Sequence, residues 1–330
     1  MNGRTILLIL LNGAYAFLVI ALASCLGSGS SHPPAIEEPG DTTITPDPAA
    51  TPTPPAPYEP GPTSGEIVVW GDSTTSGVGA SSADLSYPAQ LQALTGRSTF
   101  NGGVSGQTSD QIAAREGGSP ALLTFPANAL PSAGPVVVQS QSTLPISKEG
   151  PGPISGTIHG FHGTLDRNDN FQLIFTRDAA GVVEYIPPQS PFFPDTYGRE
   201  AQINVFWMGQ NNFYDAQAVK SDITKSIAFL STQKFIVMSL LNSGTESIGT
   251  PPYAELALIN ADLAQTYPGH FLDIRKVLIN KYDPTQPGDV QDYNNDVPPR
   301  SLRNDNEHLN DEGYRIVAQE IAALVAAKRW

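Results

Sequence analysis

Cysteine is almost absent from this sequence, because Cys25 is the single one among 330 residues. One thiol can form neither an intramolecular disulfide nor a cysteine-based zinc cluster, so an ordinary hydrophobic core must stabilise the fold. Basic residues are also scarce: 18 Lys and Arg stand against 32 Asp and Glu, and they form no run longer than two adjacent residues. Nucleic-acid binding requires a basic surface. The formal net charge of −14 therefore argues against that class of protein.

Residues 1–25 have the layout of an export signal. Arg4 supplies one positive charge near the start, and an apolar run follows over residues 6–22. Small residues lead to the tetrapeptide Leu-Ala-Ser-Cys that ends at Cys25. This ending resembles a bacterial lipobox, so we interpret the segment as a lipoprotein-type signal peptide and expect a lipid anchor on Cys25. In lipoproteins of this type an aspartate directly after the cysteine favours retention in the inner membrane. This sequence has Leu26 at that position, so the resemblance points to the outer membrane of the cell envelope. Secretion without an anchor and an uncleaved membrane-spanning helix are the alternatives.

Large apolar side chains are nearly missing from residues 26–64. Eleven prolines alternate there with Thr, Ala, Gly and acidic residues. Such a segment cannot bury enough apolar surface to fold and acts as a semi-rigid spacer. We predict a Pro-rich disordered tether between the signal and the folded part.

The rest of the chain carries an alternating strand and helix pattern. Short continuous apolar runs, typical of strands buried on both faces of a parallel sheet, occur at 66–70, 203–208 and 235–241, with a weaker one at 271–274. Segments with helical periodicity lie at 87–94, 216–230, 252–266 and 311–328. This order predicts an α/β fold, a doubly wound parallel sheet with helices on both faces. We assign this domain to residues 65–118 and 201–330.

Residues 119–200 interrupt the alternation. The stretch is dense in glycine and proline and contains hairpin-like runs at 135–139, 156–159, 171–176 and 182–186. We predict a small inserted β-rich module there.

A serine stands where the first predicted strand ends, in the tripeptide Gly71-Asp72-Ser73. Side chains at this junction lie at the carboxyl edge of the sheet, where α/β proteins build their sites. The backbone N–H groups that open a following helix favour a developing negative charge. An ordinary turn with a helix N-cap is the alternative interpretation of this tripeptide.

Asp305 and His308 precede the last predicted helix. A spacing of three residues lets the carboxylate and the imidazole lie on one side of a turn, so that Asp305 holds the ring in one tautomer while its other nitrogen faces a nucleophile. A capping or core histidine is the alternative for His308.

Hydrogen-bond donors suited to an oxyanion occur in two further blocks, at 101–109 and, directly after the strand at 203–208, at 209–212. The four blocks together, in this order, resemble the SGNH (GDSL-like) hydrolase family. The resemblance covers the folded part outside the insertion.

The resemblance implies a role for five residues. Ser73 is the nucleophile, His308 the general base and Asp305 its orienting carboxylate. The oxyanion hole consists of the backbone N–H groups of Ser73 and Gly106 and the side chain of Asn211. Within the second block Gly103 is the alternative to Gly106.

Two positions depart from the family pattern. Thr74 stands where the family often has an apolar residue, and Asn212 stands where an aspartate often follows the asparagine of the third block. These departures bear on substrate preference more than on the chemistry.

No cofactor or metal is predicted. Residues 166–170 begin like a calcium-binding loop. Phe171 stands where such a loop requires glycine, and Arg177 stands where it requires a bidentate acid, so we predict a hairpin tip instead. His159 and His162 are two possible zinc ligands without an evident third. Gly77-Val78-Gly79 lacks the third glycine of a dinucleotide-binding motif.

The residues and the resemblance predict a metal-independent serine esterase acting outside the cytoplasm, most simply a carbohydrate O-acetylesterase on a cell-surface or extracellular glycan. The tether, the inserted module and a site edge of small residues (Gly77, Gly79 and Ala80) favour the acetylated glycan as partner. A lipolytic esterase, thioesterase or lysophospholipase of the same family, a glycan O-acetyltransferase and a pseudo-enzyme whose insertion only binds are the alternatives.

The substrate-binding residues are not predicted beyond a group of aromatics in the insertion. These side chains either stack on sugar rings or form the module's own small core: Phe161, Tyr185, Phe192, Phe193 and Tyr197. Because the insertion leaves the triad untouched, its removal is expected to spare small esters and to depress activity on a polymer.

Overall fold

A computed structural model describes residues 65–146 and 152–330 of the chain. The predicted signal peptide at 1–25, with Cys25, and the predicted tether at 26–64 lie outside the described residues. Within the described ranges, none of the helices has both the length and the apolar character needed to cross a bilayer.

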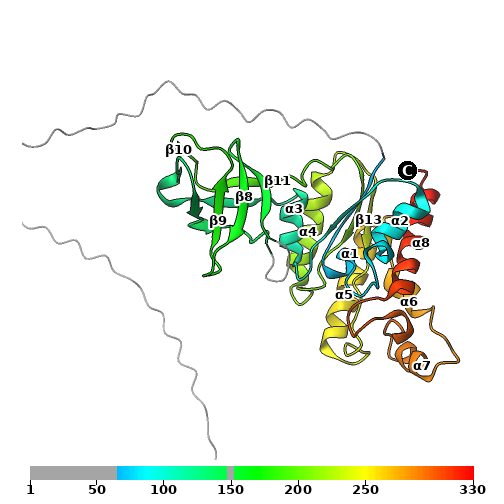
Figure 1. Ribbon diagram of the computed structural model, residues 1–330. Helices are drawn as coiled ribbons and strands as arrows, with labels where there is room; N and C mark the ends of the chain where they lie inside the picture. Colours follow the sequence, from blue (N-terminus) through cyan, green and yellow to red (C-terminus); the bar gives the residue numbers. More distant parts are fainter. Residues whose placement is uncertain (1–64, 147–151) are drawn as a thin grey trace, which may run out of the picture. The chain divides into compact units, whose positions relative to one another are not determined.

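A five-stranded parallel sheet forms the centre of the α/β part (Figure 1). Its strands, in spatial order, are β14 (Phe271–Leu272), β13 (Phe235–Met238), β12 (Ile203–Trp207), β1 (Ile67–Gly71) and β2 (Thr99–Gly103). The chain runs outward from β1 to β2 and then returns to build β12, β13 and β14 on the other side. The strand order therefore reverses between β1 and β12, and in doubly wound sheets the crevice at such a point is where ligands bind.

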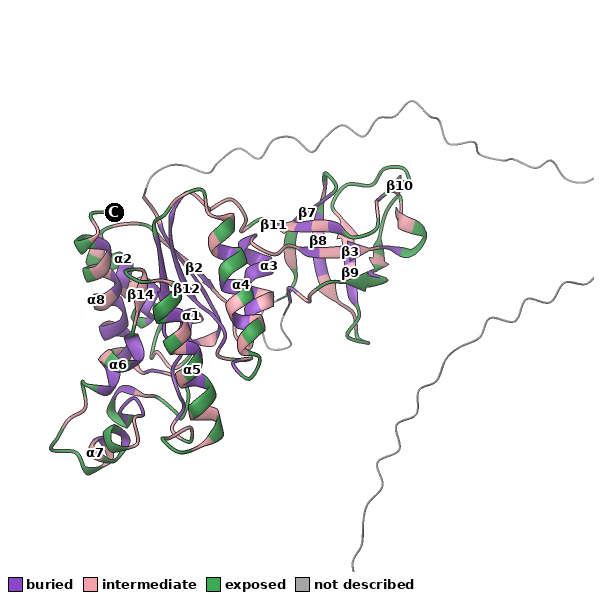
Figure 2. Cartoon of the chain, turned by 180° about the vertical axis from the view of Figure 1, so that it is seen from behind, coloured by how far each residue is buried: buried purple, intermediate pink, exposed green. Residues whose placement is uncertain are grey.

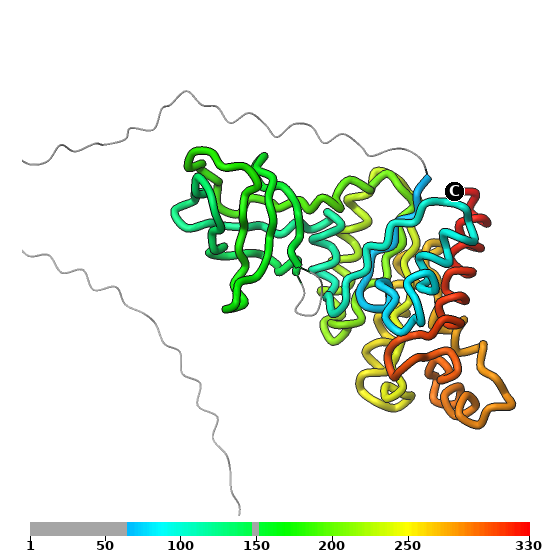
Figure 3. Tube along the Cα trace, in the orientation of Figure 1, coloured from blue at the N-terminus to red at the C-terminus, as the bar shows by residue number. Residues whose placement is uncertain are grey.

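Helices cover both faces of this sheet. Their bounds are α1 (Ser73–Ser76), α2 (Tyr87–Thr95), α3 (Ser109–Glu116), α4 (Ala216–Phe229), α5 (Pro251–Thr266), α6 (Ile274–Ile279), α7 (Pro287–Asn294) and α8 (Asp311–Ala327). Figures 1 and 2 show α2, α6 and α8 on one side and α3 and α4 on the other. The last helix, α8, runs beside α2, although the two are far apart in the sequence (Figure 3).

Both central strands are buried along their whole length, as their apolar sequences predict (Figure 2). The one polar side chain in β12, Asn204, is satisfied because its Oδ1 accepts a hydrogen bond from Trp70 Nε1 at 3.0 Å. Buried polar groups are tolerated when they are paired in this way. The predicted fold class, a doubly wound parallel sheet with helices on both faces, is confirmed.

The structure differs from the predicted elements mainly in the second block. Thr99–Gly103 is a strand, β2, although it lacks an apolar run, and α3 follows it where no helix was expected. The strand predicted at 235–241 ends at Met238. The strand predicted from the weaker run at 271–274 ends at Leu272, and α6 begins at Ile274.

A second, antiparallel sheet of seven strands lies inside the predicted insertion. In spatial order its strands are β5 (Pro135–Val137), β9 (Leu173–Arg177), β8 (Phe161–Arg167), β7 (Ile154–Ile158), β11 (Ser190–Pro194), β3 (Ala121–Thr124) and β6 (Ser140–Gln141). A two-stranded pair, β4 (Ala129–Leu130) with β10 (Glu184–Tyr185), accompanies it. The predicted hairpin tip is present, because residues 168–172 connect β8 to β9. That 119–200 is a separate module remains a prediction.

The two edges of this antiparallel sheet are joined by consecutive residues. The N–H of Val138 donates to the carbonyl of Leu173, next to one edge, and the N–H of Gln139 donates to the carbonyl of Thr124, next to the other, both at 2.8 Å. The sheet therefore curls until its edges meet. Its interior is a core of its own, centred on Phe125, Phe175 and Phe192.

Candidate active site

Ser73 lies at the carboxyl edge of the central sheet, directly after β1 (Ile67–Gly71). Asp72 caps the short helix α1, since its Oδ1 accepts a hydrogen bond from the N–H of Thr74 at 3.0 Å. The turn is tight: a Cβ on Gly71 would lie 2.1 Å from Thr75 Oγ1, so a side chain cannot be accommodated there. The Gly-Asp-Ser sequence thus folds into a turn that presents the serine hydroxyl at the sheet edge.

His308 is placed against Ser73 by the segment that leads into α8. Its Nε2 lies 3.0 Å from Ser73 Oγ, and its Nδ1 lies 2.9 Å from Asp305 Oδ2. The tautomer that fits carries its proton on Nδ1, donates it to the carboxylate and accepts at Nε2 from the serine hydroxyl. The three side chains predicted from two distant motifs therefore form one continuous hydrogen-bonded chain.

The carboxylate of Asp305 is held by the backbone as well as by the ring. Its Oδ1 accepts hydrogen bonds from the N–H groups of Glu307 and His308, both at 2.7 Å. Burial acts to raise the pKa of Asp305, but these hydrogen bonds and the ring of His308 outweigh it, so the pKa lies below its usual value. The group remains ionised and fixes the orientation of the imidazole.

The small residues that follow α1 pack against the histidine segment. A Cβ on Gly79 would lie 2.4 Å from the carbonyl oxygen of Leu309 and 3.1 Å from His308 Cβ, and its φ of +96° also requires glycine. The hydroxyl of Tyr314 in α8 donates to the carbonyl of Val78 at 2.5 Å. These contacts fix the distance between the serine loop and the histidine loop.

Asn211 reaches the same edge from β12 (Ile203–Trp207), the neighbour of β1. Its side chain is exposed, and Nδ2 donates to the carbonyl of Gln107 at 2.8 Å, with Asp72 Oδ2 at 3.4 Å. The amide is thus held beside the loop that carries Ser73. The role of Asn211 as an oxyanion donor, which the resemblance implies, stays a prediction.

The structure distinguishes the two candidate glycines of the second block. Gly106 occupies a turn closed by a hydrogen bond from Gln107 N–H to Val104 O at 3.3 Å, and its φ of +72° requires glycine. Gly103 lies in β2, and its N–H already donates to Asn101 Oδ1 at 2.9 Å. The N–H of Gly103 is therefore occupied, and Gly106 remains the predicted oxyanion donor of the second block.

Asn212 has a structural role that the sequence analysis missed. Its Oδ1 accepts from the N–H of Ser109 and its Nδ2 donates to Ser109 Oγ, both at 3.0 Å. The Ser109 hydroxyl in turn donates to Asp222 in α4 at 2.7 Å. Asn212 thus fixes the start of α3, the helix that follows the Gly106 turn.

Asp72 is a second residue whose role the motif alone did not reveal. It is 2% exposed, and burial raises its pKa to about 6 although the hydrogen bond from Thr74 N–H and the nearby His308 act in the opposite direction. Asp72 therefore titrates in the range where histidines do. It is an ionisable group at the centre of the site that is distinct from the predicted triad.

The aromatic side chains proposed to stack on sugars are mostly occupied within the protein. Phe192 is fully buried in the core of the antiparallel sheet. Phe193 packs on Tyr197, which packs on Phe229 of α4, with ring centroids 4.9 and 5.2 Å apart. For Phe192 the structure favours the second of the two alternatives, a place in the core, because the ring is not accessible to a sugar. Tyr185, in contrast, is 64% exposed.

His162 does not pair with His159. Its ring bridges two carboxylates, with Nδ1 2.6 Å from Asp178 and Nε2 3.0 Å from Asp195. Across 65–146 and 152–330, no group of three or more His, Cys, Asp or Glu side chains is arranged to hold a metal ion.

No family model matches the chain. A tail spike protein of Salmonella phage epsilon15 is 29% identical over an alignment 187 positions long, which covers 48% of this chain and 17% of the tail spike protein. The matched region is thus a small part of that much longer relative.

Similar solved structures include three hydrolases. An acetyl xylan esterase has 14% identity, covers 79% of this chain and 99% of its own, and gives a TM-score of 0.45. A lipolytic protein of the G-D-S-L family from Desulfitobacterium hafniense has 12% identity, covers 79% of this chain and 99% of its own, and gives a TM-score of 0.42. A carbohydrate acetylesterase from Sinorhizobium meliloti has 11% identity, covers 80% of this chain and 99% of its own, and gives a TM-score of 0.36.

Proposed function

We propose that the chain is a metal-independent serine esterase of the SGNH (GDSL-like) type, with Ser73, His308 and Asp305 as its triad. The observation that carries this proposal is the unbroken chain from Ser73 Oγ to His308 Nε2 at 3.0 Å and from Nδ1 to Asp305 Oδ2 at 2.9 Å. The chain lies at the carboxyl edge of the sheet, beside the point where the strand order reverses. Both the geometry and the position are those of a site for acyl transfer.

In the first half of the reaction Ser73 Oγ attacks the ester carbonyl carbon while His308 Nε2 takes the hydroxyl proton. The negative charge on the carbonyl oxygen is stabilised by the N–H groups of Ser73 and Gly106 and by Asn211 Nδ2. The tetrahedral species then collapses. The bond to the leaving oxygen breaks, and His308 returns the proton to that oxygen, which departs as an alcohol.

In the second half water attacks the acyl carbon of the acylated Ser73. His308 accepts a proton of the water as its oxygen bonds to that carbon. The Ser73 ester bond then breaks, His308 returns the proton to Ser73 Oγ, and the carboxylic acid leaves. Asp305 holds the ring and stabilises the imidazolium in both halves without taking the proton itself.

The substrate we propose is an O-acetyl ester of a cell-surface or extracellular glycan. Two features of the sequence support it: the small residues Gly77, Gly79 and Ala80 that follow the nucleophile, and the export signal and Pro-rich tether predicted at 1–64. The test is a series of nitrophenyl esters of increasing chain length, followed by acetate release from acetylated polysaccharides. Turnover that is highest with acetate supports the proposal. A preference for long chains supports a lipolytic enzyme, and transfer of acetyl to an added glycan supports a transferase.

We further propose that the protein acts in the cell envelope, anchored through a lipid on Cys25. Support comes from the apolar run at 6–22 and the lipobox-like ending. Substitution Cys25→Ser should release the protein from membranes and leave its specific activity unchanged. Continued membrane association of this variant would favour an uncleaved helix instead.

A further inference from the structure

A cavity of about 230 Å³ adjoins the candidate oxyanion hole. Its lining residues are Gln210, Asn211, Phe213, Tyr214, Ser243, Glu246 and Glu307. Asn211 is the proposed oxyanion donor, and Glu307 lies between the two triad residues Asp305 and His308. A group bound in this cavity would therefore be close to the ester bond that Ser73 attacks.

One wall of the cavity is an aromatic side chain held in a fixed orientation. Tyr214 is 67% exposed, whereas its neighbour Phe213 is only 5% exposed. Their rings stack with centroids 4.2 Å apart and an interplanar angle of 29°. The buried phenylalanine thus supports a tyrosine ring whose other face is available. An aromatic face is negative and attracts C–H groups such as those on the apolar face of a pyranose.

The remaining lining groups are polar and include the carboxyl groups of Glu246 and Glu307. Glu246 is fixed at its backbone and its side chain: Ser243 N–H donates to Oε2 at 2.7 Å, and the carbonyl accepts from Asn242 Nδ2 at 2.7 Å. Carboxylate oxygens accept hydrogen bonds, and sugar hydroxyls are suitable donors. The negative charges of the two glutamates disfavour an anionic ligand in the same space.

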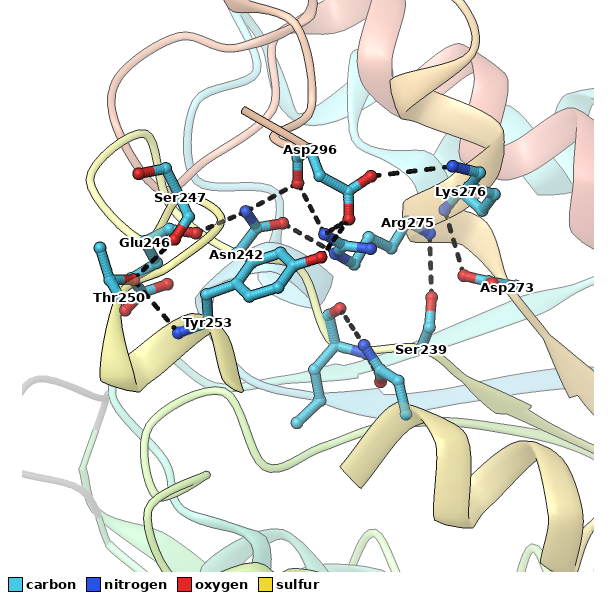
Figure 4. Close-up of polar contacts among 12 residues, drawn as sticks. Ser239, Asn242, Glu246, Ser247, Thr250, Tyr253, Asp273, Arg275, Lys276 and Asp296 are labelled. Carbon is cyan, nitrogen blue, oxygen red and sulfur yellow. Dashed lines mark hydrogen bonds and ion pairs between the residues drawn. The ribbon is translucent and has the colours of Figure 1, made fainter. Parts of the chain in front are cut away.

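A network of buried and half-buried side chains holds the loop that carries Glu246 in place (Figure 4). Asn242, which is 2% exposed, accepts at Oδ1 from Arg275 Nε at 2.8 Å and donates from Nδ2 to the carbonyl of Asp296 at 3.0 Å. Arg275 Nη2 also lies 2.6 Å from Asp296 Oδ2. This support means that the polar side of the cavity is preorganised and does not have to be ordered by the ligand.

We propose that this cavity is the subsite for the sugar ring that bears the acetyl group, and that it selects an uncharged pyranose over a uronic acid. Tyr214 stacks on the apolar face of the ring, and Glu246 and Glu307 accept hydrogen bonds from its hydroxyls. This inference rests on the proposed esterase function, because it names the substrate class of that same site.

The test compares 4-nitrophenyl acetate with an O-acetylated methyl glucoside. Tyr214→Ala should lower kcat/KM on the glucoside about tenfold, chiefly through KM, and change that on nitrophenyl acetate less than about twofold. Tyr214→Phe, which keeps the ring, should stay within about threefold on both. Tyr293→Ala is a matched control, because Tyr293 is also exposed and stacked on another ring, Tyr282, but does not line the cavity.

The charge selectivity is tested with an O-acetylated methyl galacturonide. The wild-type protein should prefer the neutral glucoside, and Glu246→Gln should reduce that preference by about threefold or more. Equal effects of Tyr214→Ala on both acetate substrates, or a wild-type preference for the galacturonide, would overturn the subsite. Absence of turnover on every ester together with unlabelled Ser73 would instead overturn the proposed esterase, so the two failures are distinguishable.

Discussion

At the scale of single residues, the proposed chemistry depends on side chains that are 235 positions apart in the sequence, Ser73 and His308. Ser73→Ala should abolish labelling by a fluorophosphonate and lower ester turnover by several orders of magnitude, with a melting temperature within a few degrees of the wild-type value. His308→Ala should be nearly as damaging, and Asp305→Asn should retain more activity. Labelling of Ser73→Ala at full stoichiometry would show that the nucleophile lies elsewhere.

The two adjacent asparagines offer a matched pair of variants. Asn211→Ala should lower kcat by roughly 10²-fold with little effect on stability, because it removes a donor to the oxyanion. Asn212→Ala should instead lower the melting temperature, because it removes two hydrogen bonds to Ser109 at the start of α3. An Asn211 variant with an altered KM and an unchanged kcat would contradict the oxyanion role.

Asp72 should make stability depend on pH. Its pKa of about 6 in the folded state lies above the value of 3.8 for an exposed aspartate, chiefly because of burial. The folded protein therefore binds this proton more tightly, so the stabilisation is complete below pH 3.8 and is lost as the pH rises through 6. Relative to wild type, Asp72→Asn should gain roughly 2–3 kcal/mol of unfolding free energy between pH 4 and pH 8. Urea unfolding at both pH values tests this, and a pH-independent difference would contradict it.

The site residues whose arrangement could be predicted from the sequence are those that stand in a short motif. Ser73, Asp305 and His308 lie within a few positions of one another or of a strand end, and the structure brings the three side chains together. The roles of Asp72, Asn212 and Tyr214 depend on partners or surroundings supplied by other segments, and no local pattern indicates these.

At the scale of secondary-structure elements, the sequence predicted the strands and helices that carry a strong apolar pattern, and it missed a strand that contains small residues. The buried strands β1 and β12 and the amphipathic helix α8 were found because apolar residues mark them. β2 contains Asn101, Gly102 and Gly103, and a Cβ on Gly102 would lie 2.5 Å from the Trp70 ring. Glycine is needed there for close packing, so the apolar signal of a strand is missing.

His162 links three strands of the antiparallel sheet in a way that depends on pH. It lies on β8, and its partners Asp178 and Asp195 follow β9 and β11. Hydrogen bonds to Asp178 and then Asp195 raise the pKa of His162, so its stabilising effect is present below the unfolded pKa and is lost as the pH rises through the folded value. His162→Gln should therefore lower the melting temperature at pH 5 but not at pH 8. Because the ring is largely exposed, the expected difference is small, roughly 1–2 °C.

At the scale of the whole molecule, the structure changes what we expect from removing residues 119–200. Gln107 Nε2 donates to Pro145 O and Gln111 Nε2 donates to Leu144 O, both at 2.8 Å. Gln107 is fully buried, and its carbonyl holds the side chain of Asn211. Residues of the predicted insertion therefore support the loop that holds Asn211, and their removal takes away the acceptor of the buried Gln107 Nε2.

Replacing 119–200 with a short Gly/Ser loop should consequently lower the melting temperature by several degrees and reduce turnover of nitrophenyl acetate about tenfold. Unchanged stability and unchanged turnover of the small ester would show that the insertion does not support the core. Tyr185→Ala provides a separate probe of substrate contact, because Tyr185 is exposed and its loss should leave the small ester unaffected.

The closure of the antiparallel sheet has a consequence for proteolysis. Its two edge strands, β5 and β6, follow one another in the chain and are joined through Val138 and Gln139. One backbone cut at this connection would expose both edges at the same time and so permit pairing with other molecules. For a protein that we propose to act outside the cell, the resistance of this sheet to proteases and to aggregation therefore depends on a single peptide connection.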